Sequence, residues 1–139
     1  MIYQLIYTSS ATELLDSHAI KELAIQAAAK NKSRKITGLF LHCQGLIFQV
    51  LEGDKKDVLS IFESIAADEQ HRGTLVLVQR ETERREFPDW YIGCRDLKES
   101  DKVENLFVLT RQSLASHLPV VPSEELDTLI QSYLRASGL

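Results

Sequence analysis

Two polar residues lie in runs of otherwise apolar and β-prone residues, Tyr7 in the run 2–8 and Gln49 in the run 46–51. A phenol can give up an electron and a proton, and a primary amide both donates and accepts hydrogen bonds. An amide next to a phenol can therefore relay a proton and settle in more than one hydrogen-bonded arrangement. These two residue types could form a two-state switch if the fold brings them together.

Strand alternation decides which side chains share a face with this pair. Successive side chains in a strand point to opposite faces. One face of the first run carries Tyr3, Leu5 and Tyr7, and one face of the later run carries Ile47, Gln49 and Leu51. If both faces meet the same helices, Tyr7 and Gln49 lie beneath one slot between those helices.

The elements that must position the pair include five strands. Runs rich in apolar and β-branched residues predict strands at 2–8, 36–43, 46–51, 74–78 and 91–95. Thr8-Ser9-Ser10 predicts a turn after the first strand, and Gln44-Gly45 predicts a tight antiparallel hairpin between the second and third.

Apolar residues at helical spacing predict a helix after the first strand and another after the third. The first helix is capped by Asp16 or Ser17, and its buried stripe is Ile20, Leu23, Ala24, Ala27 and Ala28. The second is capped by Asp54, ends near Asp68, and buries Val58, Ile61, Phe62 and Ile65.

The order β-α-β-β-α-β-β predicts an α+β fold, a ferredoxin-like sandwich with both helices on one face of an antiparallel sheet. Strands such as Leu39-Phe40-Leu41 are apolar at both parities, so the other face also needs a cover. The tail predicts a third helix with Val103, Leu106, Phe107 and Leu114. It also predicts a fourth, capped by Ser123, with Leu126, Leu129, Ile130, Tyr133 and Leu134. We expect residues 1–96 to form the main domain and 97–139 a helical hairpin on the opposite sheet face, within the same globular unit.

Composition excludes several classes of function. A chain of 139 residues with a net charge of -4 predicts one domain and offers no field that attracts a polyanion, so nucleic acid is not expected as a partner. No apolar run reaches the length of a membrane span and no leader pattern opens the chain, so we expect a cytoplasmic protein. Cys43 and Cys94 are expected to be two buried thiols rather than a disulfide.

Four stretches together resemble the BLUF family of blue-light sensors. They are Leu5-Ile6-Tyr7-Thr8-Ser9, Asn31 followed by Ile36-Thr37-Gly38, Phe48-Gln49-Val50-Leu51-Glu52-Gly53, and Phe87-Pro88-Asp89-Trp90. Each stretch alone is weak, but their order and spacing over about the first 95 residues make the combined pattern specific.

The resemblance implies a flavin, usually FAD, bound non-covalently between the two helices and edge-on to the sheet. It implies that light drives electron and proton transfer from Tyr7 through Gln49, and it makes Trp90 the third photoactive residue. Tyr7 and Ser9 then bind the cofactor, Asn31 bonds the polar edge of the ring with Lys30 beside it, and His71 lies near. Short alanines on the first helix would leave room for a planar ring against Ile61 and Ile65.

Simpler interpretations stay open for the same residues. A strand tyrosine, a buried glutamine and a lone tryptophan are commonly packing residues, and Asn31 could end a helix in the left-handed region. Lys32, Arg34 and Lys35 could face cofactor phosphates, although a solvated loop is the simpler interpretation. Two positions depart from the family pattern: Ile92 stands where most relatives carry methionine, and Gln70 where an arginine often precedes the histidine.

The sequence favours a sensor without an effector domain over an enzyme or a cofactor-free interaction module. It contains no Walker loop, no G-x-S-x-G elbow and no histidines at metal-ligand spacing. Since no effector fits in this length, we expect output through a surface. The expected partners are a second copy of the chain, as a homo-oligomer, and a separate downstream protein.

Overall fold

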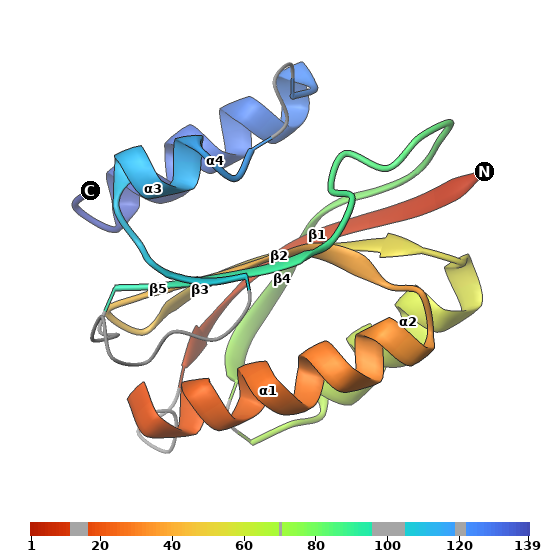
Figure 1. Ribbon diagram of the computed structural model, residues 1–139, viewed down its shortest axis with the longest axis horizontal. Coiled ribbons are helices and arrows are strands. Elements are labelled where there is room, and N and C mark those ends of the chain that lie inside the picture. Colours follow the sequence, from red (N-terminus) through yellow and green to blue (C-terminus); the bar gives the residue numbers. More distant parts are fainter. Residues whose placement is uncertain (12–16, 70, 96–104, 119–121) are drawn as a thin grey trace.

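The computed structural model describes residues 1–11, 17–69, 71–95, 105–118 and 122–139. It has three layers, with α1 and α2 on one face of a sheet and α3 and α4 on the other (Figure 1). The strands are β1 (Ile2–Ala11), β2 (Thr37–Cys43), β3 (Leu46–Gly53), β4 (His71–Thr82), β5 (Trp90–Cys94) and β6 (Leu106–Val108). The helices are α1 (Ser17–Ser33), α2 (Lys55–Ala66), α3 (Arg111–Ala115) and α4 (Glu124–Ala136). The predicted α+β sandwich, with the tail on the opposite face, is confirmed.

The sheet has the strand order β4-β1-β3-β2-β5-β6. β1 pairs antiparallel with both β3 and β4, and β2 pairs antiparallel with β3. The prediction of a fully antiparallel sheet is wrong at one edge, because β5 runs parallel to β2 and β6 runs parallel to β5. The central strands β1 and β3 are those that carry Tyr7 and Gln49.

Turn chemistry explains one correct boundary and one wrong one. Gln44 and Gly45, with φ of 49° and 83°, form the hairpin turn between β2 and β3 as predicted. The turn predicted at Thr8-Ser9-Ser10 is wrong, because β1 continues to Ala11. Ser9 and Ser10 pair with Ile47 and Leu46 of β3, so ladder hydrogen bonds override the turn preference of serine.

The helix caps follow the sequence closely. The Asp54 side chain accepts a hydrogen bond from the Lys56 N–H at 3.1 Å and starts α2, which ends two residues before Asp68. Ser123 caps α4 in the same way, accepting from the Leu126 N–H. Asp16 and the side chains of Ser17, Ile20, Leu23 and Ala24 lie outside the described residues, while Ala28 packs against the core as expected.

The predicted third helix is wrong over Leu106 and Phe107. These residues belong to the edge strand β6, where Leu106 pairs with Ile92 and Phe107 with Gly93. The helix starts only at Arg111 and has five residues, after a capping box between Thr110 and Ser113. A free edge of β5 was available to pair, and the sequence pattern alone did not reveal it. Val103 lies outside the described residues.

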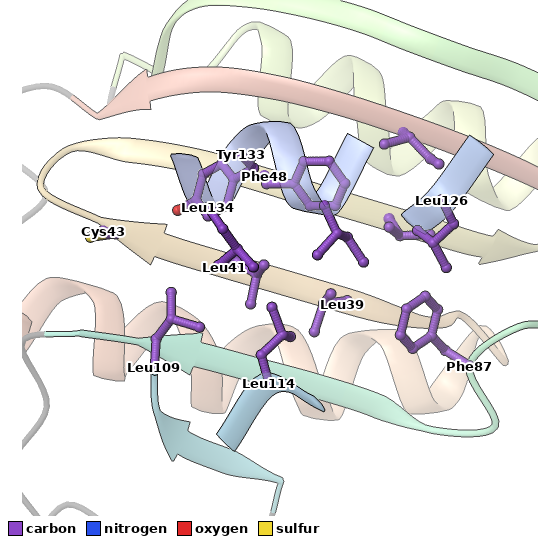
Figure 2. Packing of buried hydrophobic residues seen from close by; sticks show 13 residues of the cluster. Leu39, Leu41, Cys43, Phe48, Phe87, Leu109, Leu114, Leu126, Tyr133 and Leu134 are labelled. Atoms are coloured by element: carbon purple, nitrogen blue, oxygen red, sulfur yellow. The ribbon is translucent and has the colours of Figure 1, made fainter. Parts of the chain in front are cut away.

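Two apolar clusters cover the two faces of the sheet. The first, on the α1 and α2 face, includes Tyr7, Leu51, Ile61 and Trp90. The second, on the α4 face, is the packed cluster of Figure 2, where Phe87, Leu126 and Tyr133 meet the β2 and β3 side chains Leu39, Leu41 and Phe48. Cys43 and Cys94 are buried free thiols, as predicted. Among the described residues, no helix is long and apolar enough to cross a membrane.

Candidate functional site

The structure brings Tyr7 and Gln49 into direct contact. They are register partners in the β1–β3 pair, and the Tyr7 hydroxyl donates a hydrogen bond to Oε1 of Gln49. Tyr7 is fully buried and Gln49 is 4% exposed. Burial raises the pKa of the Tyr7 hydroxyl far above its ordinary value of 10.0, so the phenol keeps its proton. The protonated Tyr7 hydroxyl is the donor and the amide oxygen of Gln49 is the acceptor. The Nε2 group of the Gln49 amide takes no part in this hydrogen bond.

Two aromatic rings that the sequence did not single out for the site flank this pair. The Phe62 ring of α2 meets the Tyr7 ring edge-on, with 5.4 Å between centroids and 63° between planes. Phe40 of β2 is the register partner of Gln49 on its other side. Phe62 was expected only as part of the α2 stripe. An apolar stripe does not say which of its members touches a given strand residue.

Trp90 opens β5 on the same face. It is 6% exposed, and its indole N–H is buried with no hydrogen-bond partner among the described residues. A buried N–H without a partner is costly, so a ligand acceptor placed here would gain a stabilising hydrogen bond. Ile92, at the family's methionine position, is also buried on this face and pairs with Phe40.

Gly38 lets β2 lie close to the β3 backbone and leaves room for the Trp90 ring. A Cβ at Gly38 would lie 1.9 Å from the Val50 carbonyl oxygen and 3.3 Å from the Trp90 ring, and its φ is 150°. The Gly38 backbone N–H donates to the Asp89 carbonyl at 3.1 Å, and the Asp89 side chain accepts from the Trp90 backbone N–H at 2.8 Å. The Ile36-Thr37-Gly38 stretch therefore fixes the entry of β5.

Asn31 lies in the last turn of α1 and is 3% exposed. Its carbonyl accepts from the Arg34 and Ile36 N–H groups at 3.2 and 2.9 Å. The alternative of a left-handed Asn31 is wrong, because the positive φ of this turn, 56°, belongs to Lys35. A buried polar side chain in this place keeps the ligand interpretation of Asn31 open.

The other predicted site residues are more scattered. Ser9 is buried opposite Ile47, one side-chain repeat along β1 from Tyr7. His71 starts β4 and pairs through its backbone with Ala11, while its side chain and Gln70 lie outside the described residues. Lys30 and Lys32 are exposed in the last turn of α1, so the expected loop is wrong for Lys32. Beyond the helix, Lys35 is exposed and Arg34 is half-buried.

Comparison with known proteins identifies the family. Residues 2–93 match the family described as BLUF, sensors of blue-light using FAD. The chain belongs to the BLUF family. The matched range covers well over half of the chain and contains all four sequence stretches that suggested the resemblance.

The curated relatives of this BLUF protein are much longer proteins. It is 30% identical over 91 residues to the photoactivated adenylate cyclase subunit alpha of Euglena gracilis, covering 64% of this chain and 9% of that one. A second relative from the same organism, the alpha-like protein FB, is 34% identical over 83 residues, covering 60% and 8%. The chain thus spans less than a tenth of the length of these relatives.

Solved structures share the fold over nearly the whole BLUF chain. BlrP1 of Klebsiella pneumoniae, in a manganese and cyclic-diGMP complex, superposes with a TM-score of 0.75 at 26% identity, covering 99% of this chain and 33% of that one. The photo-activated state of BlsA has a TM-score of 0.65 at 20% identity, covering 88% and 97%. At this level of identity the BlsA likeness supports the fold alone.

The residues of this chain fit a flavin. A flavin ring carries hydrogen-bond donors and acceptors at one edge and apolar surface on both faces. The chain offers a matching set on one face of the sheet: the Gln49 amide, the Trp90 indole N–H, for which the described residues provide no acceptor, and the apolar residues Ile61 and Phe62 of α2. No group of three or more potential metal ligands gathers anywhere in the described ranges.

Proposed function

We propose that this protein is a blue-light receptor that binds FAD non-covalently between α1 and α2, with Tyr7 and Gln49 as its switch and Trp90 beside them. The hydrogen bond between Tyr7 and Gln49, inside a buried core, carries the proposal. The Trp90 indole N–H on the same face, which has no acceptor within the described part of the chain, supports it. Asn31 and Ser9, both buried, are the proposed additional cofactor contacts. His71, whose backbone pairs with Ala11 two residues beyond Ser9, is a further candidate.

The bound flavin would supply blue-light absorption and an electron acceptor. Tyr7 then gives up an electron, and its proton moves along the hydrogen bond to Gln49. Return of both leaves no net reaction. An amide turned end for end presents its NH₂ group to Tyr7 where it earlier presented its oxygen. The lit state on this proposal is therefore a rotated or tautomerised Gln49 with different hydrogen bonds.

The protein is a sensor module, and its output is proposed to pass through a surface. Residues 1–96 would form the flavin-binding domain and residues 97–139 the extension that changes its contacts. Two proposed recipients are a second copy of the chain and a separate downstream protein. The cyclases of Euglena carry their output within one long chain, so the present protein would need its recipient supplied by another chain or region.

An absorption spectrum in the dark and under blue light tests the photoreceptor. We expect a yellow protein whose flavin bands shift reversibly to longer wavelength, and we expect denaturation to release FAD rather than FMN. A colourless protein that takes up neither flavin on reconstitution would overturn the proposal. Release of FMN alone would overturn the choice of FAD.

Scattering and size-exclusion profiles test the output separately. We expect a change in oligomeric state, or in binding of a partner protein, between dark and light. Identical dark and light profiles of the chain, alone and with each tested partner, would contradict a surface-mediated output while leaving the photochemistry intact.

A further inference from the structure

A buried polar cluster lies on the α4 face of the sheet, at the opposite side from Tyr7 and Gln49. Its centre is Glu52 of β3, which is fully buried and pairs across the ladder with Gln4 of β1. Nε2 of Gln4 donates to Glu52 Oε2 at 3.1 Å and to Glu86 Oε2 at 2.8 Å. Buried carboxylates are rare unless a specific set of donors surrounds them, so this cluster calls for an explanation.

Glu52 holds the segment 83–89, which we call the β4–β5 connection, by its backbone. Its two carboxylate oxygens accept from the N–H groups of Glu86 at 2.9 Å and Phe87 at 2.7 Å. The Glu52 carbonyl also accepts from the Arg85 guanidinium at 2.9 Å. Trp90 follows Phe87 by three residues and lies on the other face of the sheet. The position of the connection therefore fixes where Trp90 enters the first cluster.

The same cluster reaches the first turn of α4. Glu86 Oε1 accepts from the Ser123 N–H at 2.6 Å. Arg80 of β4 donates to the Gln4 amide oxygen at 2.8 Å and to the Ser123 hydroxyl at 3.0 Å, and it pairs with Glu125 at 3.2 Å. Ser123 is the N-cap of α4. Figure 2 shows the apolar counterpart of this link, with Phe87 lying beside Leu126 of the same helix turn.

These contacts make one continuous chain of hydrogen bonds from the strand that carries Gln49 to the helix cap. We propose that Glu52 is a positioning residue that holds the β4–β5 connection in the place where Glu86 reaches the α4 cap, so that movement of Trp90, which follows this connection, shifts the N-terminus of α4. This inference rests on the proposed function, because it takes the light-driven rearrangement of Gln49 to displace Trp90, which packs in the same cluster as Tyr7. The tail then receives its signal through Glu52, Glu86 and Ser123 rather than across the apolar cluster.

Among the described residues, hydrogen bonds rather than ion pairs hold the Glu52 carboxylate. Arg80 from β4, Arg85 and Glu86 from the connection, and Glu125 from α4 all belong to the cluster, and no described cation contacts the Glu52 carboxylate directly. Burial raises the pKa of Glu52, against the lowering effect of the two backbone N–H groups and the Gln4 amide. The carboxylate is therefore held by directional hydrogen bonds. Such bonds depend on geometry more steeply than an ion pair does.

The test replaces Glu52 with Gln in the full, flavin-loaded chain. The new NH₂ group would face a backbone N–H, so at least one of the two bonds to the connection is lost at nearly constant volume. We expect amide exchange at Glu86 and Phe87 in the dark to accelerate about tenfold or more. The fluorescence of Trp90, the one tryptophan of the chain, should change with it. Glu125→Gln is the matched control, since Glu125 is an exposed member of the same cluster and should leave both readouts unchanged.

Illumination supplies the second readout. In the wild type we expect light to change amide exchange in the first turns of α4. In Glu52→Gln we expect the flavin shift to persist while the α4 change is lost. If Glu52→Gln does not fold, Arg80→Lys keeps the charge but removes the forked contact to Gln4 and Ser123, and should reduce the α4 change at least about twofold.

The outcomes separate this inference from the proposed function. A normal flavin shift together with an unaltered α4 response in Glu52→Gln, or with no α4 response in the wild type, would overturn the role of Glu52 alone. A wild type without any flavin shift would overturn the photoreceptor. The dark exchange rates of Glu86 and Phe87 would still decide whether Glu52 holds the connection.

Discussion

The two faces of the sheet are built from the same strands but for different tasks. On the α4 face the even-numbered residues of β3 include the fully buried Phe48 and Val50, and α4 closes over them with Leu126 and Ile130. Figure 2 labels Phe48 and Leu126 of this cluster. On the α1 and α2 face the neighbouring odd-numbered residues include Gln49, hydrogen-bonded to Tyr7. Alternation lets one strand contribute to a closed apolar core and a polar switch at the same time.

Substitutions on the two faces should therefore have different effects. The α4 face is held by apolar burial, so substitutions there should change the free energy of unfolding. The other face contains the buried phenol, the amide and an indole N–H without a described partner, so substitutions there should change the photochemistry.

The largest effect is expected from the switch residues. Gln49→Leu and Tyr7→Phe each remove one member of the hydrogen bond and little volume, so we expect complete loss of the light-induced flavin shift with flavin still bound. Absorption spectra in dark and light measure this.

The matched control is Tyr133→Phe on the α4 face. The Tyr133 hydroxyl donates to the Leu46 carbonyl at 2.8 Å, so this variant should keep the shift and lose about 1 kcal/mol of stability. A normal flavin shift in Tyr7→Phe would defeat the proposed mechanism.

A core truncation on the α4 face should act on stability alone. Leu126 is fully buried, and Leu126→Ala should lower the free energy of unfolding by about 2–5 kcal/mol through lost burial and a residual cavity. Urea denaturation measures the change, and the flavin shift should persist in the folded fraction. Leu75, 60% exposed, is the control: Leu75→Ala should change stability by less than about 0.5 kcal/mol. Equal losses in the two variants would contradict the assignment of the core.

Alkaline pH probes one buried tyrosine on each face. Burial raises the pKa of both Tyr7 and Tyr133 above the ordinary 10.0, so above that pH the unfolded chain loses protons that the folded chain keeps. The free energy of unfolding should therefore fall as pH rises above 10.0, by about 1.4 kcal/mol per pH unit for each of the two tyrosines.

The ultraviolet absorbance of tyrosinate, followed together with circular dichroism, should show these two groups ionising only as the chain unfolds. The double variant Tyr7→Phe with Tyr133→Phe should lose most of this pH dependence. Early titration of all the tyrosines in folded protein would show that the two hydroxyls are accessible.

Filling the alanine stripe of α1 should weaken cofactor binding with a smaller effect on the fold. Ala28 packs against the first cluster, and Ala28→Leu adds bulk toward the proposed flavin slot. We expect the flavin Kd to rise about tenfold or more, measured by fluorescence titration of the flavin-free chain. Ala29, the exposed neighbour, provides the control, because Ala29→Leu should bind flavin normally. Unchanged affinity in Ala28→Leu would move the slot away from this stripe.

The alternation of residues along the strands predicted the position of the Tyr7 and Gln49 pair better than it predicted the edge strand β6 of the sheet. The period of two placed Tyr7 and Gln49 on one face, and the register of β1 against β3 makes them neighbours. The roles assigned to Ser9, Asn31 and His71 remain predictions. Phe62 was missed as a neighbour of Tyr7, because contact between a helix and a strand depends on the angle at which they pack.

Residues close together in the chain were enough to predict the order of the elements as far as β5, the caps of α2 and α4, and which side chains of a strand share a face. The pairing of Leu106 to Val108 as β6, the parallel direction of β5 beside β2, and the bonds from Glu52 to the connection before Trp90 emerged only from the folded structure. Each of these depends on partners that are distant in sequence. A hydrogen-bonding group finds such a partner only after the chain has folded.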